Sequence, residues 1–282
     1  MTPTPSSRHS AALPPIAFIG GGNMASAILG GLIGQGAPAA GFEVVEPFEG
    51  TRERLKADFG ITALPQAGSA LTRCSIIVWA VKPQSFAEAA ATVRPYAGHA
   101  LHLSVAAGIP SDSIARWLGT ERVVRAMPNT PALVGQGISG LFARPAIAAA
   151  DRTLVEQVLA PTGQLLWVDG ESALDAVTAM SGSGPAYVFY FIEAMTEAGV
   201  EMGLPPGQAL QLAIGTFTGA SALAAGATDA PSVLRERVTS KGGTTHAAIS
   251  ALEAAQVKAS FKAAIRAAQA RAGELAQEFG RI

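Results

Sequence analysis

The sequence predicts two domains, a mostly parallel α/β domain followed by an all-helical one. Short apolar runs alternate with amphipathic or turn-rich stretches in the first part of the chain, at residues 16–20, 42–46, 75–81, 101–106 and 122–127, with further strand candidates at 137–143 and 164–169. This rhythm is typical of a parallel sheet wound by helices. From Ser172 onward the strand signals disappear and alanine-rich helical segments take over.

The length of the chain also favours two domains. A chain of 282 residues reaches the size, about 250 to 300 residues, at which single cores stop growing. The first fifteen residues contain four prolines among serines and alanines, and residues 1–14 are expected to form a disordered tail. We therefore predict a tail over residues 1–14, an α/β domain over 15–168 and a helical domain over 169–282.

Two details support the helical part. Pro205 and Pro206 suit the start of a helix, and Gly280 suits the end of one. Gly215 and Gly219 lie on one long apolar segment, where small residues would let another helix approach closely. The second domain is therefore expected to be a tightly packed bundle with the potential to form a dimer.

Composition excludes several classes of function. A formal net charge of -1 gives no general attraction to nucleic acid or to an anionic membrane. A single cysteine, Cys74, rules out an intrachain disulfide, and the four histidines show no zinc-ligand spacing, so we expect no metal site. We see no secretory signal and no stretch of about 20 residues that would span a membrane, and expect a cytoplasmic protein.

The first functional motif is Gly20-Gly21-Gly22-Asn23-Met24-Ala25, directly after a strand and before an apolar helix. Gly20 would allow a tight turn, Gly22 would let the backbone approach a pyrophosphate, and Ala25 would permit close helix packing, with the helix N-terminus facing the anion. Alone, such a glycine cluster could be an ordinary turn. Its place between strand and helix predicts a dinucleotide-binding domain of the Rossmann type.

Glu46 lies 21 residues beyond Ala25, at the end of the second strand. A carboxylate there could accept hydrogen bonds from the adenosine ribose. It would repel a 2′-phosphate unless Arg52 or Arg54 folds back toward it, so Glu46 favours NADH. The alternative is a solvated loop charge without a role in binding.

Three further strand ends carry candidate cofactor contacts, because ligands of such folds bind beyond the carboxyl ends of the strands. The third strand ends in Ala80, Val81, Lys82 and Pro83, the fourth leads into Ala106 among small residues, and the fifth leads into Asn129 between two prolines. Lys82 could equally be a surface cation, and the segment around Ala106 could be a plain strand end.

In the helical part, Ser240-Lys241-Gly242-Gly243-Thr244-Thr245 precedes a predicted helix. Consecutive glycines before a helix N-terminus form a nest of amides suited to a carboxylate, and either threonine could donate its hydroxyl to a substrate. The alternative is that the threonines only cap the helix. His246 is expected to be a surface residue. A second motif, 181–185, interrupts a helical stretch with glycine and serine.

The motifs favour hydride transfer to an imine. The chain lacks the signatures of zinc peptidases, serine hydrolases and Walker A nucleotide-binding proteins. An imine can bind already protonated, so its reduction needs cofactor positioning, an anion nest and a hydrogen-bond donor more than a strong acid. Carbonyl reduction usually requires a positioned His, Lys or Tyr acid.

Six ordered segments together resemble the pyrroline-5-carboxylate reductases: FIGGGNMA, WAVKPQ, SVAAGI, MPNTPALVGQG, DAVTAMSGSGPAYVF and VTSKGGTTHAAI. The resemblance runs from about Ile16 to the last helix. It implies a Rossmann domain followed by a helical dimerisation domain, dimers that often assemble into decamers, and reduction of 1-pyrroline-5-carboxylate to L-proline with NADPH or NADH as the last step of proline biosynthesis.

The same resemblance implies roles for individual residues. Gly20, Gly22, Asn23 and Met24 would line the pyrophosphate, 80–83 the centre of the cofactor, and Ala106 and Asn129 the nicotinamide. Ser240, Gly242, Gly243, Thr244 and Thr245 would receive the substrate, with Thr245 as the catalytic hydroxyl. Glu46 departs from relatives that use NADPH, and this leaves the choice of cofactor open.

Two other hypotheses remain. A noncatalytic dinucleotide sensor would keep the glycine motif but would not need the amide nest at 242–245. A hydroxyacid reductase or another imine reductase would be expected to carry a lysine on the active-site helix of the second domain, where only Lys241, Lys258 and Lys262 are available.

Overall fold

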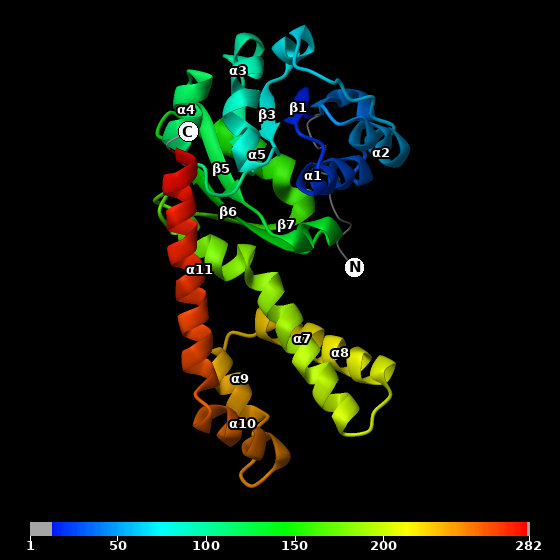
Figure 1. Ribbon diagram of the computed structural model, residues 1–282, viewed down its shortest axis with the longest axis vertical. Coiled ribbons are helices and arrows are strands. Elements are labelled where there is room, and N and C mark those ends of the chain that lie inside the picture. The colour runs from blue at the N-terminus through cyan, green and yellow to red at the C-terminus, as the bar shows by residue number, and fades with distance from the viewer. Residues whose placement is uncertain (1–12, 281–282) are drawn as a thin grey trace, which may run out of the picture. The chain divides into compact units, whose positions relative to one another are not determined.

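The computed structural model describes residues 13–280, and within them seven strands form one sheet (Figure 1). The strand order is β2-β1-β3-β4-β5-β6-β7, with β5 and β6 antiparallel and all other neighbours parallel. The strands are β1 (Ile16–Ile19), β2 (Phe42–Val45), β3 (Ile76–Trp79), β4 (Leu101–Ser104), β5 (Val123–Met127), β6 (Gly137–Ala143) and β7 (Gly163–Trp167). The predicted mostly parallel sheet is confirmed, and each strand lies at its predicted place.

Helices connect the strands and make up the rest of the described chain. Their bounds are α1 (Asn23–Gly34), α2 (Glu49–Phe59), α3 (Phe86–Ala97), α4 (Ser111–Leu118), α5 (Ala149–Leu159), α6 (Ala173–Val177), α7 (Gly184–Glu201), α8 (Pro206–Gly226), α9 (Pro231–Arg237), α10 (Thr244–Ala254) and α11 (Val257–Gly280). A π-helical turn, Thr178–Gly182, joins α6 to α7. The glycine-serine motif at 181–185 thus begins in a π-helical turn.

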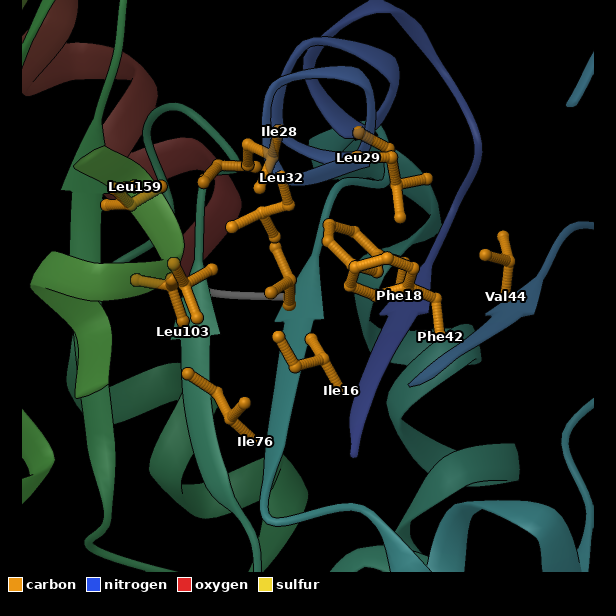
Figure 2. Packing of buried hydrophobic residues seen from close by; sticks show 14 of the residues in the cluster. Ile16, Phe18, Ile28, Leu29, Leu32, Phe42, Val44, Ile76, Leu103 and Leu159 are labelled. Atoms are coloured by element: carbon orange, nitrogen blue, oxygen red, sulfur yellow. The ribbon is translucent and has the colours of Figure 1, made fainter. Parts of the chain in front are cut away.

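Apolar residues on both faces of the sheet form the core. On one face, Ile28, Leu29 and Leu32 of α1 lie over Ile16 and Phe18 of β1 (Figure 2), and side chains of α5 complete the same cluster. On the other face, residues of α3 and α4 pack against β1, β3 and β5. Strands that are buried on both faces need continuous apolar runs, which is why these runs could be found in the sequence.

The described chain divides into two compact units, and the division differs from the predicted boundary at residue 168. The first unit contains 13–182 together with 269–280, and the second contains Ser183–Ala268. Residues 169–182 belong to the first unit because α6 and the π-helical turn pack on the sheet, where Gly140 adjoins Val177 and Gly182 adjoins the side chain of Met127.

The last turns of α11 also belong to the first unit. Phe279 packs against the core cluster that includes α3 and α4, and Ser113 Oγ of α4 donates a hydrogen bond of 3.0 Å to Gly280 O. Of the predicted disordered tail, residues 1–12 lie outside the described residues. Leu13 is described, and it packs against the core beside β1 rather than belonging to a loose tail.

The second unit is entirely helical over its described residues. α7 and α8 pack side by side, with Gly199 close to Ala209, and an edge-to-face cluster of Tyr187, Phe191 and Phe261 joins α7 to the first turns of α11. Many large apolar side chains of α7 and α8 are nevertheless exposed: Val188, Phe189, Tyr190, Met195, Val200, Leu210, Leu212, Ile214 and Leu223. An apolar surface of this extent indicates an association site.

α8 also corrects one expectation from the sequence, that no segment could span a membrane. Its 21 residues, Pro206–Gly226, are long and apolar enough to cross a membrane by length and composition alone. Association between subunits explains the same composition. A Cβ at Gly215 or Gly219 would meet no described atom within 4 Å beyond its own helical turns, so both positions leave room for another helix.

Candidate active site

The glycine loop between β1 and α1 has the geometry of an anion site. Gly20 has φ +93°, and a Cβ there would lie 2.6 Å from Ala80 O, so only glycine fits. At Gly22 a Cβ would meet no other described atom within 4 Å, which leaves open space above the backbone. Gly22 is also the N-cap of α1, and no side chain among the described residues caps this end. The first amides of α1 are therefore available to an anion.

Glu46 lies next to this loop and is only 5% exposed. Its Oε2 accepts a hydrogen bond of 2.8 Å from Gly21 N, and its Oε1 accepts one of 2.9 Å from Phe48 N. The alternative of a solvated loop charge is therefore wrong. The carboxylate holds the glycine loop in place, a role that the sequence did not reveal.

Two arginines fold back toward this region, Arg52 onto the backbone at Glu46 and Pro47 and Arg54 onto the glycine loop. Arg52 Nη1 donates to Glu46 O at 3.1 Å and to Pro47 O at 2.6 Å, and Arg54 Nη2 donates to Gly21 O at 3.2 Å. Both arginines thus fold back toward Glu46, which is the condition under which their positive charge would offset the repulsion between Glu46 and a 2′-phosphate.

The strand ends that carry the other predicted cofactor residues lie along one edge of the sheet. Ile19, Trp79, Ser104 and Arg125 are in register on β1, β3, β4 and β5. The residues that follow, Gly20, Ala80 and Ala106 among them, are thereby brought to the same edge, and Ala80 N bonds to Ile19 O at 2.8 Å.

Hydrogen bonds to nearby residues of the first unit hold both Ala106 and Asn129 in place. Ala106 N donates to Ser104 Oγ at 3.3 Å, and Ala106 is 6% exposed. Asn129 is 9% exposed, and its Oδ1 accepts a bond of 3.0 Å from Ile138 N at the start of β6. The amide oxygen of Asn129 thus shapes the turn after β5. Val81, Lys82 and Pro83 follow Ala80 beyond β3, where Lys82 is exposed.

The predicted nest forms in the second unit. Gly243 N donates to Ser240 O at 3.0 Å, Gly242 has φ +77°, and α10 begins at Thr244. Gly243 is the N-cap of α10, and within the described chain no side chain caps it. Thr244 and Thr245 occupy the first two positions of the helix, so the hypothesis that they serve as its cap is wrong. The amides of the first turn and the threonine hydroxyls are placed where a carboxylate would be bound.

A doubly wound sheet with an uncapped glycine loop, followed by a helical unit with an exposed apolar surface, defines a nicotinamide-dinucleotide oxidoreductase that associates through its helices. Comparison with family models agrees: residues 15–108 match an NADP oxidoreductase family described as coenzyme F420-dependent, and residues 171–275 match the pyrroline-5-carboxylate reductase dimerisation model.

Similar proteins identify the family. The chain is 43% identical over 269 residues to the pyrroline-5-carboxylate reductase of Pseudomonas aeruginosa, covering 95% of this chain and 98% of the relative. A solved pyrroline-5-carboxylate reductase from Coxiella burnetii has a TM-score of 0.87 and 34% identity, with coverage of 93% and 98%. A Plasmodium falciparum pyrroline carboxylate reductase with NADP bound has a TM-score of 0.85 and 26% identity, with coverage of 95% and 100%.

The chain belongs to the pyrroline-5-carboxylate reductases. It is an NAD(P)H-dependent oxidoreductase that reduces 1-pyrroline-5-carboxylate to L-proline in proline biosynthesis, and it carries the dimerisation domain of that family. This excludes the hypothesis of a noncatalytic sensor and confirms the resemblance from which the function was predicted.

Proposed function

We propose that Thr245 is the catalytic hydroxyl and that the nest around it binds the substrate. The uncapped N-terminus of α10 is the observation that carries the proposal. Ser240, Gly242, Gly243 and Thr244 surround the same turn, and backbone amides of the first helical turn hold the carboxylate of 1-pyrroline-5-carboxylate. The Thr245 hydroxyl donates a hydrogen bond to the ring nitrogen as that nitrogen becomes a neutral amine.

We propose further that the first unit binds the cofactor along the edge described above. Gly20, Gly22, Asn23 and Met24 hold the pyrophosphate, because the space above Gly22 is open and the amides of α1 are uncapped. Ala80, Val81, Lys82 and Pro83 line the centre of the cofactor, and Ala106 and Asn129 lie on the nicotinamide side. When bound there, the reduced nicotinamide supplies the hydride.

The protein's own part in the reaction is to bind and orient. The imine arrives protonated from solvent, and therefore no side chain has to deliver a proton before hydride transfer. The nest fixes the substrate through its carboxylate, and Thr245 strengthens its hydrogen bond as the transition state forms.

Variants of Thr245 test this assignment. Thr245→Ala should lower kcat about tenfold to a hundredfold, since a donor that acts mainly in the transition state is lost, while the Kd for NAD(P)H stays unchanged. Thr245→Ser keeps the hydroxyl and should retain activity. Thr216→Ala is a matched control, because the Thr216 hydroxyl bonds only to Leu212 O of its own helix at 2.8 Å. Full kcat and KM in Thr245→Ala would refute the placement of the active site.

For the cofactor, we propose that both NADH and NADPH are accepted. Glu46 alone favours NADH, but Arg52 bonds to the backbone of Glu46 and Arg54 to that of Gly21, and both provide positive charge for a 2′-phosphate. Arg52→Gln should therefore lower kcat/KM for NADPH more than for NADH, whereas Arg152→Gln, whose guanidinium lies over Trp167, should change neither. An unchanged ratio in Arg52→Gln would exclude this arginine from cofactor selection.

For the assembly, we propose a homodimer formed through the helical unit, with further association into a decamer, in the cytoplasm. The exposed apolar residues of α7 and α8 support the dimer, because they form a surface that a lone subunit would leave in water. Light scattering at several protein concentrations tests both levels, and a fully active monomer would contradict the proposal.

A further inference from the structure

The connection between β4 and α4, residues 105–110, is tied to the rest of the first unit at several points. At its beginning, Ser104 Oγ accepts a hydrogen bond from Ala106 N. In its middle, Gly108 has φ +73°, and a Cβ there would meet the Phe279 ring at 3.2 Å and Leu275 Cβ at 3.4 Å. The final turns of α11 therefore lie against this connection.

The end of the connection is held by Glu171, which lies between β7 and α6. One carboxylate oxygen, Oε1, accepts bonds of 2.6 Å from both Ser111 N and Arg125 Nη1. The other, Oε2, accepts a bond of 2.6 Å from Ser111 Oγ. Glu171 thus caps α4 at its first residue from 60 positions away in the sequence. Charge-assisted bonds of this length are the strong ones.

Arg125 connects Glu171 to the start of the 105–110 connection as well. Its side chain is 8% exposed, and within the described chain its Nε has no hydrogen-bond partner, so the Glu171 carboxylate is what compensates this buried charge. Arg125 is also in register with Ser104, the residue from which the connection starts. The ion pair is therefore linked to both ends of residues 105–110. Arg125 lies on β5 beside Ser104, which precedes the segment, and Glu171 bonds to Ser111, which follows it.

Asp175 is a second acid close to Arg125, but it does not replace Glu171. Burial raises the pKa of Asp175, Arg125 lowers it to a lesser degree, and the nearby Glu171 charge raises it again. Glu171 is the acid for which the geometry shows an ion pair with Arg125, at 2.6 Å.

We propose that Glu171 is a positioning residue for hydride transfer, because its carboxylate joins Arg125 to the N-terminus of α4 and so fixes residues 105–110 beside the nicotinamide. The proposal depends on the nicotinamide placement at Ala106 given above. Hydride transfer is sensitive to small displacements: a misplacement of about 1 Å can cost a hundredfold in rate. A segment that lies beside the nicotinamide therefore has to be held from outside the cofactor site.

The test compares Glu171→Gln with Asp151→Asn in the full-length enzyme. Asp151 is a matched control, since its carboxylate also joins an arginine, Arg122 at 2.7 Å, to a backbone amide at the start of a helix, Ala148 N at 3.2 Å. Four quantities are measured for each: kcat, the primary deuterium isotope effect with 4-deuterated cofactor, the Kd for NAD(P)H, and the fluorescence lifetime of bound NAD(P)H without substrate.

Glu171→Gln should lower kcat about tenfold to a hundredfold, raise the isotope effect and shorten the fluorescence lifetime of the bound nicotinamide. The Kd should change less than about twofold, because the pyrophosphate is held by the glycine loop. Asp151→Asn should lower the thermal melting temperature without these changes. If Glu171→Gln does not fold, Ser111→Ala removes the bond to Oε2 together with a longer bond of 3.1 Å from Arg144 Nη1 to Ser111 Oγ, and it should produce the same pattern more weakly.

Two outcomes distinguish a failure of the role proposed for Glu171 from a failure of the proposed function. Should Glu171→Gln and Ser111→Ala lose only thermal stability, as the control does, Glu171 is structural and the inference is overturned. If Thr245→Ala kept full kcat and KM, the proposed placement of the substrate site would fail. The lifetime of the bound cofactor, measured without substrate, would still decide the role of Glu171.

Discussion

Lowering the pH should destabilise the first unit through one buried histidine, His102. The residue is 1% exposed on β4. Its Nδ1 accepts a hydrogen bond of 3.0 Å from Trp79 Nε1, and its Nε2 lies 3.2 Å from Ala97 O. An indole nitrogen can only donate, so Nδ1 carries no proton and Nε2 donates to the carbonyl. Protonation of Nδ1 would place two donors against each other inside the core.

Burial accordingly lowers the pKa of His102 from 6.5 to about 4, and the Ala97 bond offsets this only in part. Above pH 6.5 the imidazole is neutral in both the folded and the unfolded chain. Between pH 6.5 and pH 4 only the unfolded chain binds the proton, and stability falls by about 1.4 kcal/mol for each pH unit, about 3 kcal/mol in all. The contribution is therefore complete above pH 6.5 and is lost on acidification.

Urea unfolding at fixed protein concentration, from pH 7.5 to pH 4, measures this effect. The three tryptophans, Trp79, Trp117 and Trp167, all lie in the first unit, so their fluorescence reports on its unfolding. His102→Asn keeps an acceptor for the Trp79 indole but does not titrate. Its stability deficit relative to the unmodified enzyme should shrink by about 3 kcal/mol between pH 7.5 and pH 4.

A second variant, His99→Asn, shows whether the loss of any neighbouring imidazole has the same result. Parallel pH curves for His102→Asn and the unmodified enzyme would refute the reasoning. They would mean that His102 is protonated equally in the folded and unfolded chain.

Three other predictions concern the cofactor loop and the assembly. Gly22→Val should fold but lose NAD(P)H binding, because its side chain fills the open space above the loop, whereas Gly20→Val should not fold, since its Cβ would lie 2.6 Å from Ala80 O; equal thermal melts of the two variants would contradict this. Glu46→Gln should raise KM for both cofactors by weakening the hold on Gly21, but less for NADPH, because the charge that disfavours a 2′-phosphate is lost; an effect on one cofactor alone, measured by steady-state kinetics, would show that Glu46 acts only on the ribose. Gly219→Leu should shift the enzyme toward monomer in light scattering, and an unchanged dimer would place the interface elsewhere.

The parts of the fold that depend on local pattern could be predicted from the sequence. The seven strands lie where short apolar runs had indicated them. The pattern is clearest in β1 and β3, which are buried at every residue and apolar throughout. Gly20 and Gly22 were found for a similar reason, since a positive φ or a close approach of backbone restricts the residue type. The amide nest before α10 followed from its consecutive glycines.

The features that depend on distant contacts could not be predicted in this way. Glu46 reaches Gly21 across 25 positions, and Glu171 reaches Ser111 across 60. Neither acid belongs to a motif that encodes its partner. The boundary at residue 168 differs from the observed division for the same reason, because α6 and the end of α11 are helical in pattern yet pack with the sheet. Periodicity reveals the type of an element but not its neighbours.

The contribution of α11 to the first unit has a consequence for how the protein is made. The first unit is discontinuous in sequence: residues 13–182 are synthesised before the second unit, but residues 269–280, which pack on α4 and Gly108, are synthesised after it. At a synthesis rate of about 5 to 20 residues per second, the earlier part waits several seconds or more for its final helical turns. All residues of the second unit are therefore synthesised before the first unit is complete, and a chain cut after residue 268 would lack the helical turns that pack on α4 and Gly108.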